Sequence, residues 1–321
     1  MAGRTLVEVL RARAREHPDR CAYTFLADGE TQASCWTYDE LDARARAVGG
    51  LLQSLGLRGE RALLLYPPGL DFVAGFFGAL YGGTVAVAVQ PPRVHRGLGS
   101  LRRLVEDARP AVVLTTTALL AKLGGHLSRD PVLGRLRCLA TEAPPTGLEE
   151  EWRDPGSAPE ATAFLQYTSG STSDPKGVMV GHGNLVHNLG LIQEACRHSA
   201  ASTFVSWLPP YHDLGLIGNL LQSAYVGARC VFMSPVAFLQ APRRWLEAVS
   251  RCGATTSGGP NFAYDLCARK VSPAEIAGLD LSRWEVAFNG AEPVRHETIE
   301  RFAELVAPAG FRREAFYPCY G

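Results

Sequence analysis

The sequence has no surplus of charge of either sign. Its 321 residues include 32 Lys plus Arg and 32 Asp plus Glu, so the formal net charge is zero. A neutral chain lacks the extended field that attracts nucleic acid or an anionic membrane. We therefore expect no nucleic-acid partner, and any partner must be recognised by local features.

Apolar runs of membrane-spanning length are also missing. The longest candidate, 70–81, is interrupted by Asp71, Gly75 and Gly78 and is shorter than the roughly 20 residues that a transmembrane helix needs. The first residues lack the apolar core of a signal peptide, and Thr5-Leu-Val-Glu8 reads instead as a helix capping box. These features predict a cytoplasmic protein without a transmembrane segment.

The eight cysteines include no C-x-x-C pair, which argues against a zinc site or a dithiol redox motif. They are scattered along the chain, and we interpret them as free thiols in a reducing compartment.

The chain is rich in apolar residues, at 46%, and shows an alternation of strand-like and helix-like segments. Strand, helix, strand order is typical of parallel sheets covered by helices. The expected strands lie at 61–66, 84–89, 111–116, 137–140, 164–167, 204–208, 230–233, 255–256, 285–288 and 315–317. The expected helices lie at 37–56, 70–81, 100–108, 184–197, 214–226, 241–252, 260–269 and 294–306.

A stretch rich in Pro, Gly and acidic residues at 141–160 keeps no apolar period and is interpreted as a connection. The predicted fold class is therefore α/β, with two sequential α/β sheet subdomains at 1–150 and 151–321.

The most unusual segment is Tyr167-Thr-Ser-Gly-Ser-Thr-Ser-Asp-Pro-Lys-Gly177, which comes directly after an expected strand. Its glycines allow close backbone approach, its hydroxyl groups and amides donate to phosphate oxygens, and Lys176 supplies a positive charge. Pro175 stands where a Walker A loop needs its second glycine, so a P-loop kinase or GTPase is disfavoured. An ordinary Ser/Gly surface loop is the alternative, and the ordered series favours phosphate binding over it.

Three further motifs also come after expected strands, where α/β sheets place their ligands. They are Ser206-Trp-Leu-Pro-Pro-Tyr-His-Asp-Leu-Gly-Leu-Ile-Gly218, Asn289-Gly-Ala-Glu-Pro293 and Phe316-Tyr-Pro-Cys-Tyr-Gly321. Within them, Asp213 is expected to cap a helix N-terminus, and Glu292 to serve as a first-turn carboxylate as readily as a ligand contact.

Taken in order, these segments resemble the superfamily of acyl-CoA synthetases, firefly luciferase and nonribosomal adenylation domains. The resemblance implies an ATP-dependent ligase that forms an acyl-adenylate, with Lys176 and His212 as catalytic residues. His212 would lie beside the substrate carboxylate, and Tyr320 would stack on adenine. The implied phosphate and nucleotide contacts are Thr168, Ser169, Gly170, Ser171, Thr172, Gly177, Gly290, Ala291, Glu292, Pro293, Tyr320 and Gly321.

A narrower resemblance, to fatty acyl-AMP ligases, rests on 207–218, 258–267 and 313–321. It implies transfer of the acyl group to an acyl carrier protein, often of a polyketide synthase, and an acyl pocket containing Trp207, Gly258, Gly259 and Phe262. The two glycines would leave room for the chain, although simple helix packing explains any one of these residues equally well.

In the family that the chain resembles, several functional groups lie downstream of the position of Gly321. They are the Mg²⁺-binding glutamate, a ribose-binding aspartate and a mobile domain with a further catalytic lysine. No metal ligand is then expected among these 321 residues, and the fragment is expected to be incomplete for catalysis. An acyl-CoA synthetase, or a non-catalytic nucleotide- or acyl-binding fragment, remains an alternative.

Overall fold

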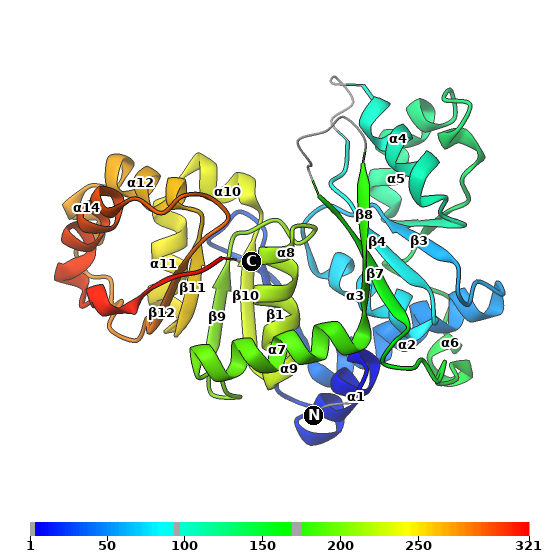
Figure 1. Ribbon diagram of the computed structural model, residues 1–321, viewed down its shortest axis with the longest axis horizontal. Coiled ribbons are helices and arrows are strands. Elements are labelled where there is room, and N and C mark those ends of the chain that lie inside the picture. The colour runs from blue at the N-terminus through cyan, green and yellow to red at the C-terminus, as the bar shows by residue number, and fades with distance from the viewer. Residues whose placement is uncertain (1–3, 93–96, 169–174, 321) are drawn as a thin grey trace. The chain divides into compact units, whose positions relative to one another are not determined.

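The computed structural model describes residues 4–92, 97–168 and 175–320 (Figure 1). They form two compact units, each built around its own sheet. The first unit comprises Met1–Asp19 and Tyr38–Gly190, and the second comprises Arg20–Thr37 and Leu191–Gly321. None of the helices in the described ranges combines the length and apolar character needed to cross a bilayer.

The first unit has a six-stranded sheet with the order β6-β5-β3-β4-β7-β8. All neighbours are parallel except β7 and β8, which are antiparallel. The strands are β3 (Arg61–Leu64), β4 (Val85–Ala88), β5 (Val112–Thr115), β6 (Cys138–Ala140), β7 (Thr162–Thr168) and β8 (Lys176–Gly181). The helices are α1 (Leu6–Glu16), α2 (Tyr38–Ser54), α3 (Leu70–Tyr81), α4 (Gly99–Ala108), α5 (Thr117–Leu127) and α6 (Leu148–Glu151), and α7 (His182–Cys196) begins here and ends in the second unit.

The capping box predicted at the start of the chain is present. The Thr5 hydroxyl accepts from the Glu8 amide, and the Glu8 carboxylate accepts from the Thr5 amide at 2.7 Å. Two of the otherwise unpaired amides at the start of α1 are thereby satisfied.

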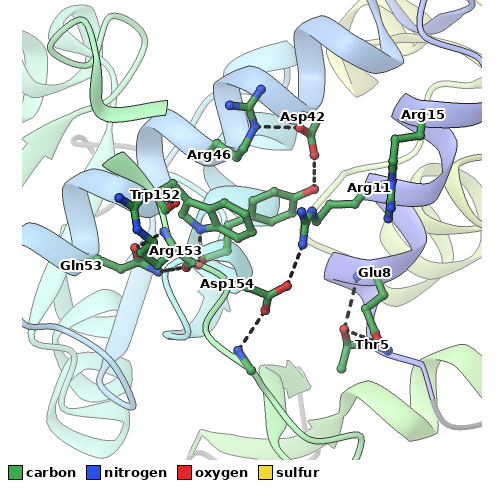
Figure 2. A network of polar contacts seen from close by, with 12 residues as sticks. Thr5, Glu8, Arg11, Arg15, Asp42, Arg46, Gln53, Trp152, Arg153 and Asp154 are labelled. Atoms are coloured by element: carbon green, nitrogen blue, oxygen red, sulfur yellow. Dashed lines mark hydrogen bonds and ion pairs between the residues drawn. The ribbon is translucent and has the colours of Figure 1, made fainter. Parts of the chain in front are cut away.

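The segment 141–160, predicted as a plain connection, is anchored in the first unit by a buried tryptophan (Figure 2). Trp152 Nε1 donates to the Tyr81 carbonyl at 2.8 Å, and the two rings pack with centroids 5.1 Å apart. Gln53 exchanges two hydrogen bonds with the backbone of Arg153. Arg11 lies over the Trp152 ring at 5.0 Å and pairs with Asp154. The segment is therefore held against α1, α2 and α3.

The second unit has a seven-stranded sheet with the order β13-β12-β11-β9-β10-β1-β2. All neighbours are parallel except β1 and β2. The strands are β1 (Cys21–Leu26), β2 (Gln32–Thr37), β9 (Thr203–Ser206), β10 (Arg229–Met233), β11 (Thr256–Gly259), β12 (Val286–Asn289) and β13 (Phe316–Pro318). The helices are α8 (Asp213–Gly215), a π-helical segment (Leu216–Leu221), α9 (Gln222–Val226), α10 (Pro235–Gln240), α11 (Arg243–Cys252), α12 (Asn261–Lys270), α13 (Pro273–Ile276) and α14 (His296–Val306).

An aromatic core centred on Trp245 packs against this second sheet. The indole is fully buried, donates to Ser257 Oγ at 2.8 Å and contacts a ring of aromatic side chains. These are Trp207, Phe238, Tyr264, Trp284 and Phe302. This core supports the strand ends at which the predicted site residues lie.

The fold class predicted from the sequence, two α/β sheets, is confirmed. The boundary between the two units, however, does not fall between residues 150 and 151, as the sequence predicted. β7 and β8 come after that point yet complete the first sheet, because β7 pairs with β4. The hairpin β1–β2 precedes it yet joins the second sheet, because β1 pairs with β10. The pairing of strands that are distant in the sequence therefore determines which residues belong to each unit. The change in composition at 141–160 does not reveal this pairing.

The prediction that all eight cysteines are free is wrong for one pair. Cys21 and Cys35 are joined by a disulfide across the β1–β2 hairpin, with Cα atoms 6.5 Å apart. The spacing of 14 residues matches no short cysteine motif, and only the hairpin register brings the two together. The free thiols are Cys138, Cys196, Cys230, Cys252, Cys267 and Cys319.

Candidate active site

Four parallel strands of the second unit end at one edge of its sheet, and a predicted site segment lies at the end of each. β9 leads to Trp207 and His212, β11 ends at Gly259, and β12 leads to Gly290. Gly259 lies in register with Asn289, which lies in register with Pro318 of β13. Because the carboxyl ends of parallel strands share an edge, three of the predicted motifs meet there.

His212 is held by the aspartate next to it in the chain. Its Nδ1 lies 2.6 Å from Asp213 Oδ1, and hydrogen bonding to this carboxylate raises the pKa of the half-exposed imidazole. The Leu214 amide lies 2.6 Å from the same oxygen and 3.3 Å from Nδ1, so we assign that donor to the carboxylate. An Nδ1 that donates to Asp213 leaves the Nε2 of the ring for another hydrogen bond. Asp213 was expected to cap α8, but His212 occupies the N-cap position and Asp213 is the first helical residue.

The room left by the two glycines of β11 is taken by protein atoms. A Cβ on Gly258 would meet the Phe288 carbonyl oxygen, and one on Gly259 would lie 2.5 Å from the Trp207 ring. Trp207 is buried, stacks on Phe238 at 4.0 Å and meets Phe262 edge-on at 5.9 Å. Gly259 therefore lets Trp207 lie flat on the strand, and Trp207 and the exposed Phe262 together form an aromatic wall.

The turn after β12 packs closely against β13. A Cβ on Gly290 would lie 2.7 Å from both the carbonyl oxygen and Sγ of Cys319, so only glycine fits. Ala291 has a φ of +68°, the left-handed region that residues with a Cβ rarely adopt. The ring of Tyr320, after β13, is fully exposed. The backbone of this turn is therefore closely packed, whereas the Tyr320 ring is open to solvent.

Glu292 does not lie in the first turn of the next helix, as one interpretation of the sequence had it. α14 begins at His296, and Glu292 Oε1 instead accepts from the Phe262 amide at 2.6 Å, at the start of α12.

The predicted phosphate loop belongs to the first unit and joins β7 to β8. Thr168 ends β7 and lies in register with Lys176, the exposed first residue of β8. Gly177 faces the Tyr167 ring, which a Cβ would approach to 2.9 Å. The predicted contacts Ser169, Gly170, Ser171 and Thr172, together with Gly321, lie outside the described residues.

Two buried polar groups at the strand edge have no hydrogen-bond partner among the described residues. They are Trp207 Nε1 and the side-chain amide of Asn289, which is completely buried. Unpaired buried donors and acceptors are costly and mark places where a ligand or water completes the structure. Asn289 was not among the residues predicted from the sequence, although it directly precedes the Gly-Ala-Glu-Pro turn.

The two sheets and the strand-end motifs define an AMP-binding enzyme: residues 10–321 match that family, and the chain belongs to it. Its relatives within the family include fatty acyl-AMP ligases, as the motifs predicted. The chain is 44% identical over 321 residues to the medium-chain-fatty-acid–[acyl-carrier-protein] ligase JamA of Moorena producens. It is 36% identical over 330 residues to the long-chain-fatty-acid–AMP ligase FadD32 of Mycolicibacterium smegmatis. Each match covers 99% of this chain.

The fold has a solved counterpart in a fatty acyl-adenylate ligase from Legionella pneumophila, crystallised with acyl adenylate and pyrophosphate. The TM-score is 0.93 at 42% identity, covering 99% of this chain and 55% of that one. The chain likewise spans 54% of JamA and 52% of FadD32. It therefore corresponds to about half the length of the relatives it matches.

Proposed function

We propose that the chain forms the nucleotide- and acyl-binding portion of a fatty acyl-AMP ligase. The enzyme would activate a fatty acid with ATP and pass the acyl group to an acyl carrier protein, free or within a polyketide synthase. The observation that supports the proposal is that β9, β11 and β12 end at the same edge of the second sheet and lead to His212, to the start of α12 with Phe262, and to the turn 290–293.

In the proposed reaction a carboxylate oxygen of the fatty acid attacks the α-phosphorus of ATP, and pyrophosphate leaves. His212 would donate from Nε2 to the carboxylate and hold it in position, and Lys176 would neutralise charge on the departing phosphates. The thiol of the carrier's pantetheine then attacks the acyl carbonyl, and AMP leaves. Mg²⁺ would screen phosphate charge. No metal-binding cluster of three or more His, Cys, Asp or Glu is found among the described residues, so we assign the ion no ligand here.

Gly290, Ala291 and Pro293 would flank adenine through their backbone, with Tyr320 stacking on the base. Trp207 and Phe262 would line the acyl chain, with Gly259 leaving room for the Trp207 ring and Gly258 leaving room for Phe288. The proposal includes a cytoplasmic location, because the proposed enzyme uses ATP and an acyl carrier protein as substrates.

The decisive experiment offers two thiol acceptors to the full-length protein. With radiolabelled decanoate and ATP, we expect the label on holo acyl carrier protein and little acyl-CoA. The choice matters because putative fatty-acid–CoA ligases FadD21, 34% identical over 331 residues, are also relatives. Efficient acyl-CoA formation would favour that class instead, and absence of decanoate-dependent pyrophosphate exchange would reject both.

Exchange of Asp213 for Asn should move the alkaline limb of the pH–activity profile. The hydrogen bond to Asp213 raises the pKa of His212, so the wild-type imidazole keeps its proton to higher pH than an ordinary histidine with a pKa of 6.5. Without the carboxylate, the proton is lost at lower pH. We therefore expect the alkaline limb of kcat/KM for decanoate to shift to lower pH.

At the acidic end of the profile the two enzymes should become nearly equal, because His212 becomes protonated in both. This point serves as the internal control, and the side chain introduced by Asp213→Asn retains an oxygen for the Leu214 amide. Superimposable profiles would show that His212 does not act as a protonated donor.

A further inference from the structure

The two walls of the proposed site in the second unit are joined by an exchange of helix caps. The nucleotide wall, 290–295, leads into α14, and the acyl wall, 260–262, leads into α12. Figure 1 shows α12 and α14 lying side by side, and the two helices are in contact. Their preceding strands, β11 and β12, are neighbours in the sheet.

Neither helix caps its own N-terminus. The N-cap positions are held by Pro260 in α12 and Arg295 in α14, and neither makes a side-chain capping bond. Helix N-termini usually rely on Ser, Thr, Asp or Asn at this position to satisfy a free amide. The first amides of both helices therefore need partners from elsewhere.

Each segment supplies the partner that the other lacks. Glu292, from the nucleotide wall, accepts from the Phe262 amide of α12 at 2.6 Å. Asn261, from α12, accepts from the Arg295 amide at 3.0 Å through Oδ1 and donates to Thr298 Oγ1 of α14 at 3.3 Å through Nδ2. Three hydrogen bonds thus tie the start of one helix to the start of the other.

The backbone between these bonds is strained. Ala291 is in the left-handed region, and Gly290 is pinned against Cys319. A residue with a Cβ adopts such a conformation only where its surroundings impose it. The Glu292 bond, one residue further on, ties this turn to the start of α12.

We propose that Glu292 is a positioning residue that couples the two halves of the site, so that nucleotide on the 290–293 turn and fatty acid against Phe262 favour each other's binding. The inference rests on the proposed function and adds to it a thermodynamic link. A ligand that orders one wall also orders the other through the exchanged caps, so the protein loses less conformational freedom when the second ligand binds.

The test measures decanoate binding to the full-length protein with and without saturating α,β-methylene-ATP, by calorimetry. For the wild type we expect the analogue to tighten decanoate binding by a factor of about 5 or more, the usual lower range of coupling between sites. Glu292→Ala should bring this factor close to one. Glu292→Gln keeps the accepting oxygen and should restore most of it. Glu297→Ala, an exposed glutamate in the first turn of α14, is the matched control and should behave as wild type.

The outcomes separate the possible roles. If Glu292→Ala lowers the melting temperature but keeps the coupling factor, the residue is only structural and the inference is wrong. If Glu292→Gln is as defective as Glu292→Ala, the carboxylate charge touches a ligand directly, which also overturns it. A wild type that binds both ligands without coupling rejects the link alone, whereas one that binds neither rejects the proposed function and the link with it.

Discussion

Replacing Lys176 with alanine should slow decanoate-dependent pyrophosphate exchange by about 10²–10³-fold, the cost of removing one preorganised charge or donor from a transition state. The lysine begins β8 directly after the predicted phosphate loop, and its side chain is exposed. Among the described residues, the Lys176 ammonium group has no hydrogen bond or ion pair, and in the proposed function it binds the polyphosphate. The effect should fall on kcat and on the KM for ATP, and the KM for decanoate should change little.

Two variants control this prediction. Lys122→Ala removes another exposed lysine, from α5, and should leave exchange unchanged. Lys176→Arg keeps the charge but replaces a compact ammonium with a planar fork, so partial activity is expected. β8 pairs with β7 through backbone hydrogen bonds, so the melting temperature should be the same in all variants. Undiminished exchange by Lys176→Ala would show that the loop does not hold the departing phosphates.

The sequence was most informative where a local pattern determines the structure. The helix predicted at 70–81 begins and ends at those residues, because Gly69 and Gly82 bound a mainly apolar segment. The capping box at Thr5 formed as its spacing indicates. The strand-end motifs also lie at one edge, since parallel strands place their carboxyl ends together.

Features that depend on contacts distant in sequence were missed. β8 was not predicted, because on this edge strand Val178 and Met179 are both exposed and no clear alternation survives. The segment 255–256 was predicted too short, because the strand continues through Gly258 and Gly259, whose lack of side chains hides it. The exchanged caps of α12 and α14 have no local signature, since each helix start takes its partner from about 30 residues away.

Trp152 illustrates the same limit, and its removal should lower the stability of the first unit strongly. It lies in the Pro- and acid-rich stretch that composition marks as a connection, yet its side chain is buried against α3. Trp152→Ala removes the packing against Tyr81 and leaves the Tyr81 carbonyl without that donor. Large-to-small changes of this kind cost about 3–5 kcal/mol. We expect a loss of this size in the free energy of unfolding of the first unit, measured by urea denaturation with circular dichroism.

Tyr81 connects Trp152 to the ion pair between Asp42 and Arg46. We therefore expect the variants of this network to differ in how much stability they lose. Its hydroxyl donates to Asp42 at 2.6 Å, and Asp42 pairs with Arg46 at 2.8 Å (Figure 2). Trp152→Phe keeps an aromatic ring on Tyr81 and should lose less than Trp152→Ala. Arg11→Ala removes only a partly exposed cation above the ring and should cost about 1 kcal/mol or less.

Hydrogen exchange can locate the effect within the first unit. If Trp152 holds the segment against α3, the amides of 70–81 and 148–154 should lose protection together in Trp152→Ala. Amides of α14, in the second unit, should keep theirs. A variant whose 70–81 amides stay fully protected would show that 141–160 is the plain connection that its composition suggests, and that the buried indole adds no stability to α3.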